Sequence, residues 1–388
     1  MRIYPHVQAL LGRDGLRYAW DFQAVCTALD ALRSGLDPYR AYLSAHGLPV
    51  TYPVLHIYIL APLCALSGEP VVYVMVIAGI ALASGVALWR LVPATPWDRI
   101  AVLVAIFAGF KAFDWELTTG NVAILELPLA AATVRLLAAR KYAWSGLAFG
   151  LMASVKILPL VGAAALLLIP ESAAARARSF SSALAGFLAV HILNAVLFAR
   201  WLPSYFAMLT WKATGGTAED TGGVLNQDTI HCIVDGLGRL GFNQPMAGFA
   251  IACLGLAMGA LIALACRPGT PTREPLPPVA AVSLIVLALW LFLFRQKNYA
   301  FEAFVPFTVA AGYGVGLWTG RLAILASIVV TAAFFTHAIP VRFLDDYHQL
   351  MGAWSAFLVL LTGAVFGSRP AARGGTVAAA QDGLPADG

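Results

Sequence analysis

Long apolar runs recur along almost the whole chain, and they limit what it can fold into. A helix needs about 20 apolar residues to cross the hydrocarbon core of a bilayer. Only 12% of the 388 residues are charged, roughly half of the 25% that is usual in soluble domains. The sequence therefore predicts an all-α, polytopic integral membrane protein with about nine full crossings. The candidate crossings are residues 71–91, 99–113, 121–139, 180–200, 245–266, 279–294, 300–318, 322–340 and 349–366.

Two further apolar stretches do not fit a simple crossing. Residues 54–67 are too short and contain Pro62, whereas residues 143–169 are long enough but are interrupted by Lys156 and Pro159. Proline breaks the hydrogen-bond ladder of a helix, and broken backbone at membrane depth is tolerated where it lines a polar cavity. We therefore predict a half-helix or interfacial helix at 54–67 and a re-entrant element at 143–169.

The basic residues of the short loops predict the orientation of the chain. Positive charge favours the cytoplasmic side of a membrane, and these loops all fall on one face if residues 143–169 enter and leave on the same side. The opposite, extracytoplasmic face then holds most of the unusual polar clusters, in residues 18–53, 114–120, 201–244, 295–299 and 341–348. The basic residues are Arg90, Arg99, Arg135, Arg140, Lys141, Arg176, Arg178, Arg267, Arg273, Arg321, Arg369 and Arg373.

This orientation divides the chain into four parts. An N-terminal segment, 1–17, precedes an extracytoplasmic loop at 18–53, and a multi-spanning membrane domain covers 54–367. The tail at 368–388 is rich in alanine and glycine, and we expect it to be disordered and cytoplasmic. The predicted location is the cell inner (plasma) membrane, with multiple passes.

The extracytoplasmic loop contains the pattern of one short amphipathic helix. Its apolar positions share one helical face, Gly35 suits the stop that follows a helix, and Asp37-Pro38-Tyr39 suits the turn after that stop. Residue type alone leaves two roles open for Asp21, which precedes the pattern: an N-cap, where aspartate is favoured, or a catalytic carboxylate. The apolar positions are Phe22, Val25, Leu29 and Leu32.

Several stretches taken together resemble glycosyltransferase family 87. They are Asp21 with "GLDPY" at 35–39, "TYPVLHIYILAPL" at 51–63, the region from "TTGNVAIL" to "SVKILPL" at 118–160, and "GGVLNQD" at 222–228. The resemblance covers roughly residues 18–310. It implies a C-type membrane enzyme that transfers a hexose, typically mannose, from a polyprenyl phosphate to a lipid or glycan acceptor. It also implies that Asp21 is the general base.

The sequence departs from the family pattern at two points. The family has a transmembrane helix before the aspartate, and residues 1–17 contain no apolar run of that kind. We therefore expect that a first helix is missing from this chain. Similar proteins carry a histidine near the segment "RQKNY", where this chain has Asn298 and Tyr299.

The proposed transfer needs a base, cations for the donor phosphate, and polar groups for the sugar. Asp21 is our candidate base, with Asp114, Glu116 and the intramembrane Glu126 as alternatives. Lys156, Arg295 and Lys297 are candidates for the phosphate, because Lys and Arg suit that group. The candidates for the sugar and the acceptor are Asn226, Gln227, Asp228, His231, Asn298 and Asn121, and Tyr52 is a candidate for lining the path of the lipid.

Each of these residues also has an ordinary structural interpretation. Acidic loop residues are usually solvated, and Lys156 can form a buried ion pair with an acid such as Glu126. Arg295 and Lys297 can snorkel to lipid headgroups, Asn226 or Asp228 can cap a helix, and interfacial tyrosine is common at membrane surfaces.

The sequence implies no cofactor, no metal and no nucleic-acid partner. The five cysteines, Cys26, Cys64, Cys232, Cys253 and Cys266, show no metal-like spacing, and we expect Cys253 and Cys266 to be buried small hydrophobes. The group from His337 to His348 also matches no tight metal site. The main alternative function is a transporter or flippase for a lipid-linked sugar. That class predicts paired interrupted helices in two halves, whereas both interruptions here lie in the first half.

Overall fold

The computed structural model describes about half of the chain in detail, and that part is helical. The prediction of an all-α protein is confirmed for these residues, which include no strand. Two helices in the described part are long and apolar enough to cross a membrane, so the nine predicted crossings remain a prediction. The described residues are 20–41, 50–66, 70–89, 122–155, 158–213, 238, 241–266, 276–293, 309–310, 313–314, 316–318, 320–334 and 355–366.

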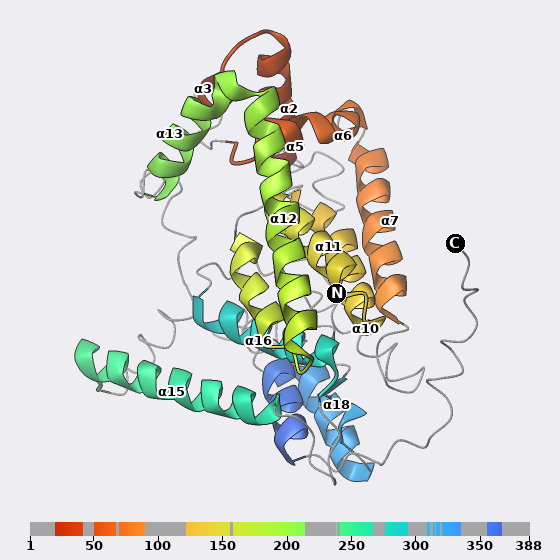
Figure 1. Ribbon diagram of the computed structural model, residues 1–388, viewed down its shortest axis with the longest axis vertical. Coiled ribbons are helices and arrows are strands. Elements are labelled where there is room, and N and C mark those ends of the chain that lie inside the picture. Colours follow the sequence, from red (N-terminus) through yellow and green to blue (C-terminus); the bar gives the residue numbers. More distant parts are fainter. Residues whose placement is uncertain are drawn as a thin grey trace.

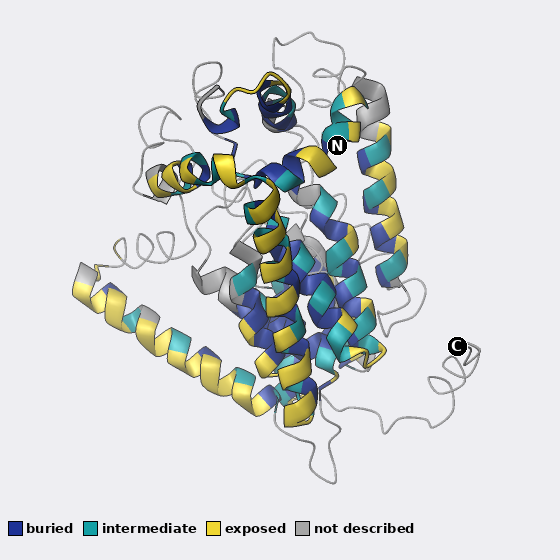
Figure 2. Cartoon of the chain, turned by 45° about the horizontal axis from the view of Figure 1, so that its top comes forward, coloured by how far each residue is buried: buried dark blue, intermediate teal, exposed yellow. Residues whose placement is uncertain are grey.

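The two membrane-capable helices are α12 (Ala173–Leu197) and α15 (Gln244–Ala265). Each begins at a side-chain cap: Ser172 accepts from the Ala175 N–H, and Asn243 accepts from the Met246 N–H. Figure 2 shows long exposed faces on both helices, and the exposed side chains are largely apolar. Such faces suit contact with lipid, because lipid tails replace water as the solvent of a membrane helix. Cys253 lies exposed on α15, so its predicted burial is wrong.

The remaining apolar runs form shorter helices. Residues 71–91 correspond to α7 (Pro70–Trp89), and 121–139 divide into the 3₁₀ helix η1 (Val122–Glu126) and α10 (Leu127–Ala138). The C-terminal helices are α16 (Pro278–Leu293), α18 (Gly320–Phe334) and residues 355–366. Figure 1 shows α10, α11 and α16 beside the lower half of α12.

The segment predicted to be re-entrant forms a hairpin. It consists of α11 (Tyr142–Val155) and the 3₁₀ helix η2 (Leu158–Leu167). Fourteen α-helical residues rise about 21 Å, and ten 3₁₀ residues rise about 20 Å. The two ends meet, because the Arg140 Nε lies 3.8 Å from the Glu171 Oε1. The segment therefore returns toward its starting point, and its predicted entry and exit on the same side of a membrane stays a prediction.

Small residues allow α11 and α12 to pack with their backbones in contact. A Cβ added at Gly146 would overlap the carbonyl group of Ser179, and one added at Gly150 would overlap that of Ala183. A Cβ added at Gly186 of α12 would lie 3.0 Å from the Leu147 carbonyl oxygen of α11, which is a tight but longer contact. Glycines four residues apart on one helix face are typical of close helix pairs in membranes.

At one end of α12, five short helices form a layer that we call the cap. They are α2 (Trp20–Arg33), α3 (Pro38–Ala41), α5 (Val54–Ile59), α6 (Ala61–Leu66) and α13 (Leu202–Ala213), with the 3₁₀ turn η3 (Ala199–Trp201) linking α12 to α13. Figure 1 shows them gathered above the long helices. The short α5–α6 pair confirms that residues 54–67 do not form one full crossing.

The predicted amphipathic helix is α2, and its four apolar positions are all buried. It ends as predicted at Gly35, which has φ +71°. There the Leu36 N–H donates to the Ala31 carbonyl and the Gly35 N–H to the Leu32 carbonyl, which is the Schellman arrangement. The helix begins at Trp20, so Asp21 lies in its first turn rather than at the N-cap, which was one of the two roles that residue type left open.

Candidate functional site

The structure describes two of the predicted site residues. The backbone of Asp21 lies in the first turn of α2. The Tyr52 side chain is 8% exposed, and the Tyr52 carbonyl accepts a hydrogen bond from the Tyr39 hydroxyl at 3.1 Å. The other predicted site residues lie outside the described residues, and their roles stay predictions. They are Asp114, Asn121, Lys156, Asn226, Gln227, Asp228, His231, Arg295, Lys297 and Asn298.

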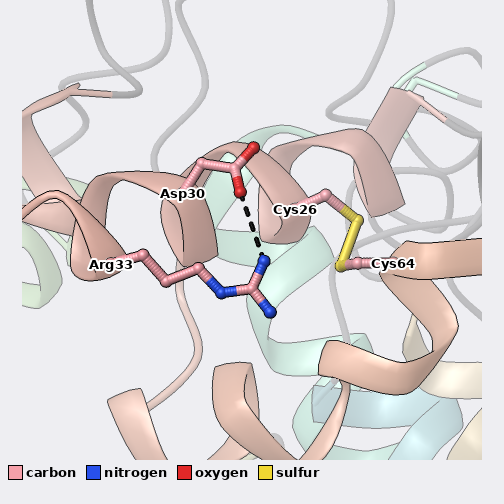
Figure 3. The surroundings of a disulfide bond; sticks show 4 residues. All are labelled: Cys26, Asp30, Arg33 and Cys64. Atoms are coloured by element: carbon pink, nitrogen blue, oxygen red, sulfur yellow. Dashed lines mark ion pairs between the residues drawn. A yellow bond between two sulfur atoms is a disulfide. The ribbon is translucent and has the colours of Figure 1, made fainter.

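A disulfide bond between Cys26 and Cys64 joins α2 to α6 within the cap (Figure 3). The two Cα atoms lie 5.4 Å apart, which is a usual separation for a disulfide. Sequence reasoning did not pair these cysteines. A usable signal was present, since both lie in or beside segments predicted for the extracytoplasmic face.

The motif "GLDPY" holds the cap together. Asp37 Oδ1 accepts from the Tyr39 N–H at 3.0 Å and so caps α3, while Asp37 Oδ2 accepts from the Ser204 hydroxyl of α13 at 2.5 Å. Tyr39 is buried, and its ring packs on that of Tyr205 at 5.4 Å between centroids. Burial, with the nearby Tyr205 and Asp37, raises the pKa of Tyr39, so its hydroxyl keeps its proton and remains a donor.

A cluster of polar side chains that sequence analysis missed lies where α5 meets α11 and α12. His56 of α5 is 6% exposed, and its Nε2 lies 3.3 Å from the Ser154 Oγ of α11. Asn194 of α12 is also buried, and its Oδ1 accepts from the Leu55 N–H at 2.9 Å. His191 lies one turn before Asn194. The signal was the presence of these polar residues within apolar stretches, since buried polar groups require partners.

The environment of His56 keeps its imidazole neutral. Burial, and secondarily the neighbouring His191, lower the pKa of His56 to about 4. Its Nδ1 and the Nε2 of His191 are both buried, and neither has a hydrogen-bond partner among the described residues. We call His56, Ser154, His191 and Asn194 the junction cluster.

Basic side chains collect at the end of the hairpin that lies away from the cap. Arg135 and Arg140 flank the turn after α10, Lys141 precedes α11, and Arg176 and Arg178 lie in the first turns of α12. Arg135, Arg140, Lys141 and Arg178 are exposed. The 25 residues of α12 span about 37 Å, so this basic end and the cap lie far apart along that helix.

Glu126, weighed in the sequence as an intramembrane acid, is buried at the end of η1. It lies directly before α10, and the Pro128 that follows suits the first turn of that helix. Its burial agrees with the sequence expectation of an acid within the apolar region.

The comparisons with known proteins give one match. The family model for glycosyltransferase family 87 matches residues 51–294, which include the hairpin, α12 and the whole junction cluster. No curated protein and no solved structure matches the chain. The matched region is more than half of the chain, and it contains the stretches that suggested the same family from sequence, apart from Asp21 and "GLDPY" at 35–39. The chain therefore belongs to glycosyltransferase family 87.

Proposed function

We propose that this membrane glycosyltransferase moves a hexose, in our interpretation mannose, from a polyprenyl phosphate to a lipid or glycan acceptor. The reaction takes place at the extracytoplasmic face, and Asp21 is the general base. The observation that carries the proposal is the disulfide-bonded cap, because it contains Asp21 and lies at the end of α12 opposite the basic residues.

Two independent features support this orientation. Disulfides persist in oxidising compartments, such as a periplasm or the cell exterior, and Cys26–Cys64 lies in the cap. Basic loops favour the cytoplasm, and five basic residues beside the ends of α10, α11 and α12 lie away from the cap, which itself contains Arg33 and Arg200. Both features support an extracytoplasmic cap, where a lipid-linked sugar donor would present its sugar.

The position of Asp21 suits a carboxylate base. The first turn of a helix favours negative charge, because the N–H groups there point outward without helical partners. A base must be ionised to accept a proton at neutral pH. The first turn of α2 therefore favours the ionised form of the carboxylate that the reaction needs. The disulfide bond fixes α2 to α6. The family match begins at residue 51, so the assignment of Asp21 rests on its resemblance and position.

The transfer itself is a single in-line displacement. The acceptor hydroxyl oxygen attacks the anomeric carbon of the hexose, its proton passes to Asp21, and the bond from that carbon to the phosphate oxygen breaks. The polyprenyl phosphate leaves with the bonding electron pair, and the anomeric configuration inverts. Lys156, Arg295 and Lys297 are the proposed cations for the phosphate, since charge-assisted bonds stabilise the negative charge that it gains.

Asp21→Asn tests the assigned base, with Asp30→Asn as a matched control. Asp30 lies on the same helix, is exposed, and forms only a surface ion pair with Arg33 at 3.6 Å. A general base contributes roughly 10²- to 10⁴-fold, so we expect Asp21→Asn to lose at least about 10²-fold in transfer of radiolabelled mannose. Asp30→Asn should retain transfer. Full activity of Asp21→Asn would refute the base assignment.

The same preparation separates the enzyme from a transporter. Wild-type protein in sealed vesicles receives the polyprenyl-phosphate mannose and a lipid extract as acceptor. We expect labelled mannose in a new lipid product. Movement of the intact donor across the bilayer without such a product would refute the transferase proposal and favour a flippase.

A further inference from the structure

The junction cluster contains a buried hydrogen-bond acceptor whose state can be deduced. The Ser154 hydroxyl lies 2.7 Å from the Leu151 carbonyl, to which it donates its single hydrogen. The same oxygen lies 3.3 Å from the His56 Nε2, and this contact is the longer of the two. We assign the hydroxyl hydrogen to the shorter contact, so the Ser154 oxygen accepts from the Nε2–H, and this tautomer leaves Nδ1 as a bare acceptor.

This acceptor is held in place by its neighbours. The Leu55 N–H bonds to Asn194, and the ring of Tyr58 stacks on that of Phe198 at 5.4 Å between centroids. These contacts lie on either side of His56 in the sequence and fix α5 to the end of α12. Nδ1 is enclosed and has no hydrogen-bond partner among the described residues. A buried acceptor without a donor is unfavourable, and this cost is recovered when a donor binds.

The chemistry of the cluster indicates the kind of donor. Neutral imidazole carries no charge to attract a phosphate, and the described residues place no group of three metal ligands around it, whereas it accepts readily from a hydroxyl group. The Nε2 of His191 is a second buried ring nitrogen without a partner among the described residues. His191 is near enough to His56 to act on it electrostatically. Two such nitrogens suit a molecule with several hydroxyl groups, which a sugar has and a polyprenyl chain lacks.

We propose that His56, held by Ser154 as the Nε2–H tautomer, accepts a hydrogen bond at Nδ1 from a hydroxyl group of the transferred sugar. His56 is then a substrate-binding residue and Ser154 a positioning residue. This inference rests on the proposed function, since it assigns a contact within the same site. Because Nδ1 is enclosed, the sugar reaches it when the helices around it part, and the site closes over the substrate.

Two amide substitutions separate this role from a purely structural one. The side-chain amide of glutamine places its nitrogen near the position of Nε2, so His56→Gln keeps the bond to Ser154 and loses the Nδ1 acceptor. The shorter asparagine places its oxygen near the position of Nδ1, so His56→Asn keeps an acceptor and loses the Ser154 bond. A substrate contact is preserved by Asn, whereas a structural contact is preserved by Gln.

The measurement uses full-length protein in lipid nanodiscs, with polyprenyl-phosphate mannose as donor. We expect His56→Gln to raise the KM for the donor about fivefold, the loss expected for one neutral hydrogen bond. His56→Asn should stay within about twofold of wild type on the same grounds. The donor should also raise the Tm of wild type and His56→Asn more than sugar-free polyprenyl phosphate does, and this difference should be smaller in His56→Gln.

Normal kinetics for His56→Gln with impaired kinetics for His56→Asn would overturn the inference. Equal impairment of both variants, with a lowered Tm in each, would also overturn it. If neither variant folds, Ser154→Ala tests the same point, because it leaves His56 in place but removes the contact that holds the ring hydrogen on Nε2. An unchanged KM in Ser154→Ala would then overturn it. Absence of transfer by the wild type refutes the proposed function, whereas wild-type transfer with an unchanged His56→Gln refutes only this inference.

Discussion

Loss of the Cys26–Cys64 disulfide is expected to loosen the cap without unfolding the helices beneath it. The bridge links residues separated by 38 positions, and closing such a loop stabilises a chain by about 4 kcal/mol at 25 °C in the chain-entropy estimate. The helices α5 and α6 have six residues each, and helices shorter than about 12 residues are marginal by themselves. We therefore expect Cys64→Ser to lower the free energy of local unfolding of the cap by ~2–4 kcal/mol.

Hydrogen exchange of protein in nanodiscs measures this loss region by region. A fall of ~3 kcal/mol corresponds to roughly 10²-fold faster exchange of the amides that open with the cap. These are the amides of α2, α5 and α6, whereas those of α11 and α12 should exchange at the wild-type rate. Cys253→Ser is the matched control, since this cysteine is free and exposed on α15. Treatment of the wild type with dithiothreitol should reproduce the behaviour of Cys64→Ser.

Two results would refute this reasoning. Equal exchange of the cap amides in wild type and Cys64→Ser would mean that the bridge adds nothing to packing that already fixes the cap. Equally faster exchange throughout α11 and α12 would mean that the cap does not open as a separate unit. In that second case the disulfide would stabilise the whole described structure instead.

Three further predictions concern the hairpin and the junction cluster. Gly150→Ala should destabilise the protein by about 1–3 kcal/mol in thermal unfolding, because the new Cβ overlaps the carbonyl of Ala183. The control Gly255→Ala, which has open space around it, should change stability by no more than ~0.5 kcal/mol. Equal effects of the two substitutions would contradict the close packing of α11 on α12. Stability should fall by up to ~3 kcal/mol as the pH drops from about 6.5 to about 4. In that range His56 takes up a proton in the unfolded chain but not in the folded protein, so acid favours unfolding. A His56→Phe variant that loses stability over the same pH range as the wild type would contradict this prediction. Arg140→Gly should raise stability by ~1 kcal/mol, because Arg140 has φ +56° and its side chain is 75% exposed in its ion pair with the mostly buried Glu171. A lower Tm would contradict this reasoning.

Features that depend on neighbouring residues were predicted from the sequence. The amphipathic period of α2 and its stop at Gly35 come from local rules of helix formation, and the structure follows both. The break near Pro159 was also predicted, and the ion pair between Arg140 and Glu171 agrees with the same-side return that loop charge required. Local sequence patterns and loop charge were therefore sufficient to predict α2 and the interruption of residues 143–169.

Features that depend on distant residues were not predicted. His56 and Ser154 are 98 positions apart, and no pattern of hydropathy links two residues at that separation. The disulfide was missed because five cysteines allow many pairings, and spacing cannot choose among them. The exact start of α2 could not be fixed from the sequence, because aspartate is favoured both at the N-cap and within the first turn, where the dipole also favours it.

The same distant contacts explain how a six-residue helix can hold a functional group. By its own propensity α5 would not persist, so it exists because other elements fix it on three sides. The adjoining α6 is bonded to α2 by the disulfide, Asn194 and Phe198 hold α5 against α12, and Ser154 orients His56 from α11. A segment formed only by such contacts responds as a unit to any change at one of them. It therefore suits the proposed site, in which α5 would move to admit a lipid-linked donor and then recover one defined geometry around the sugar.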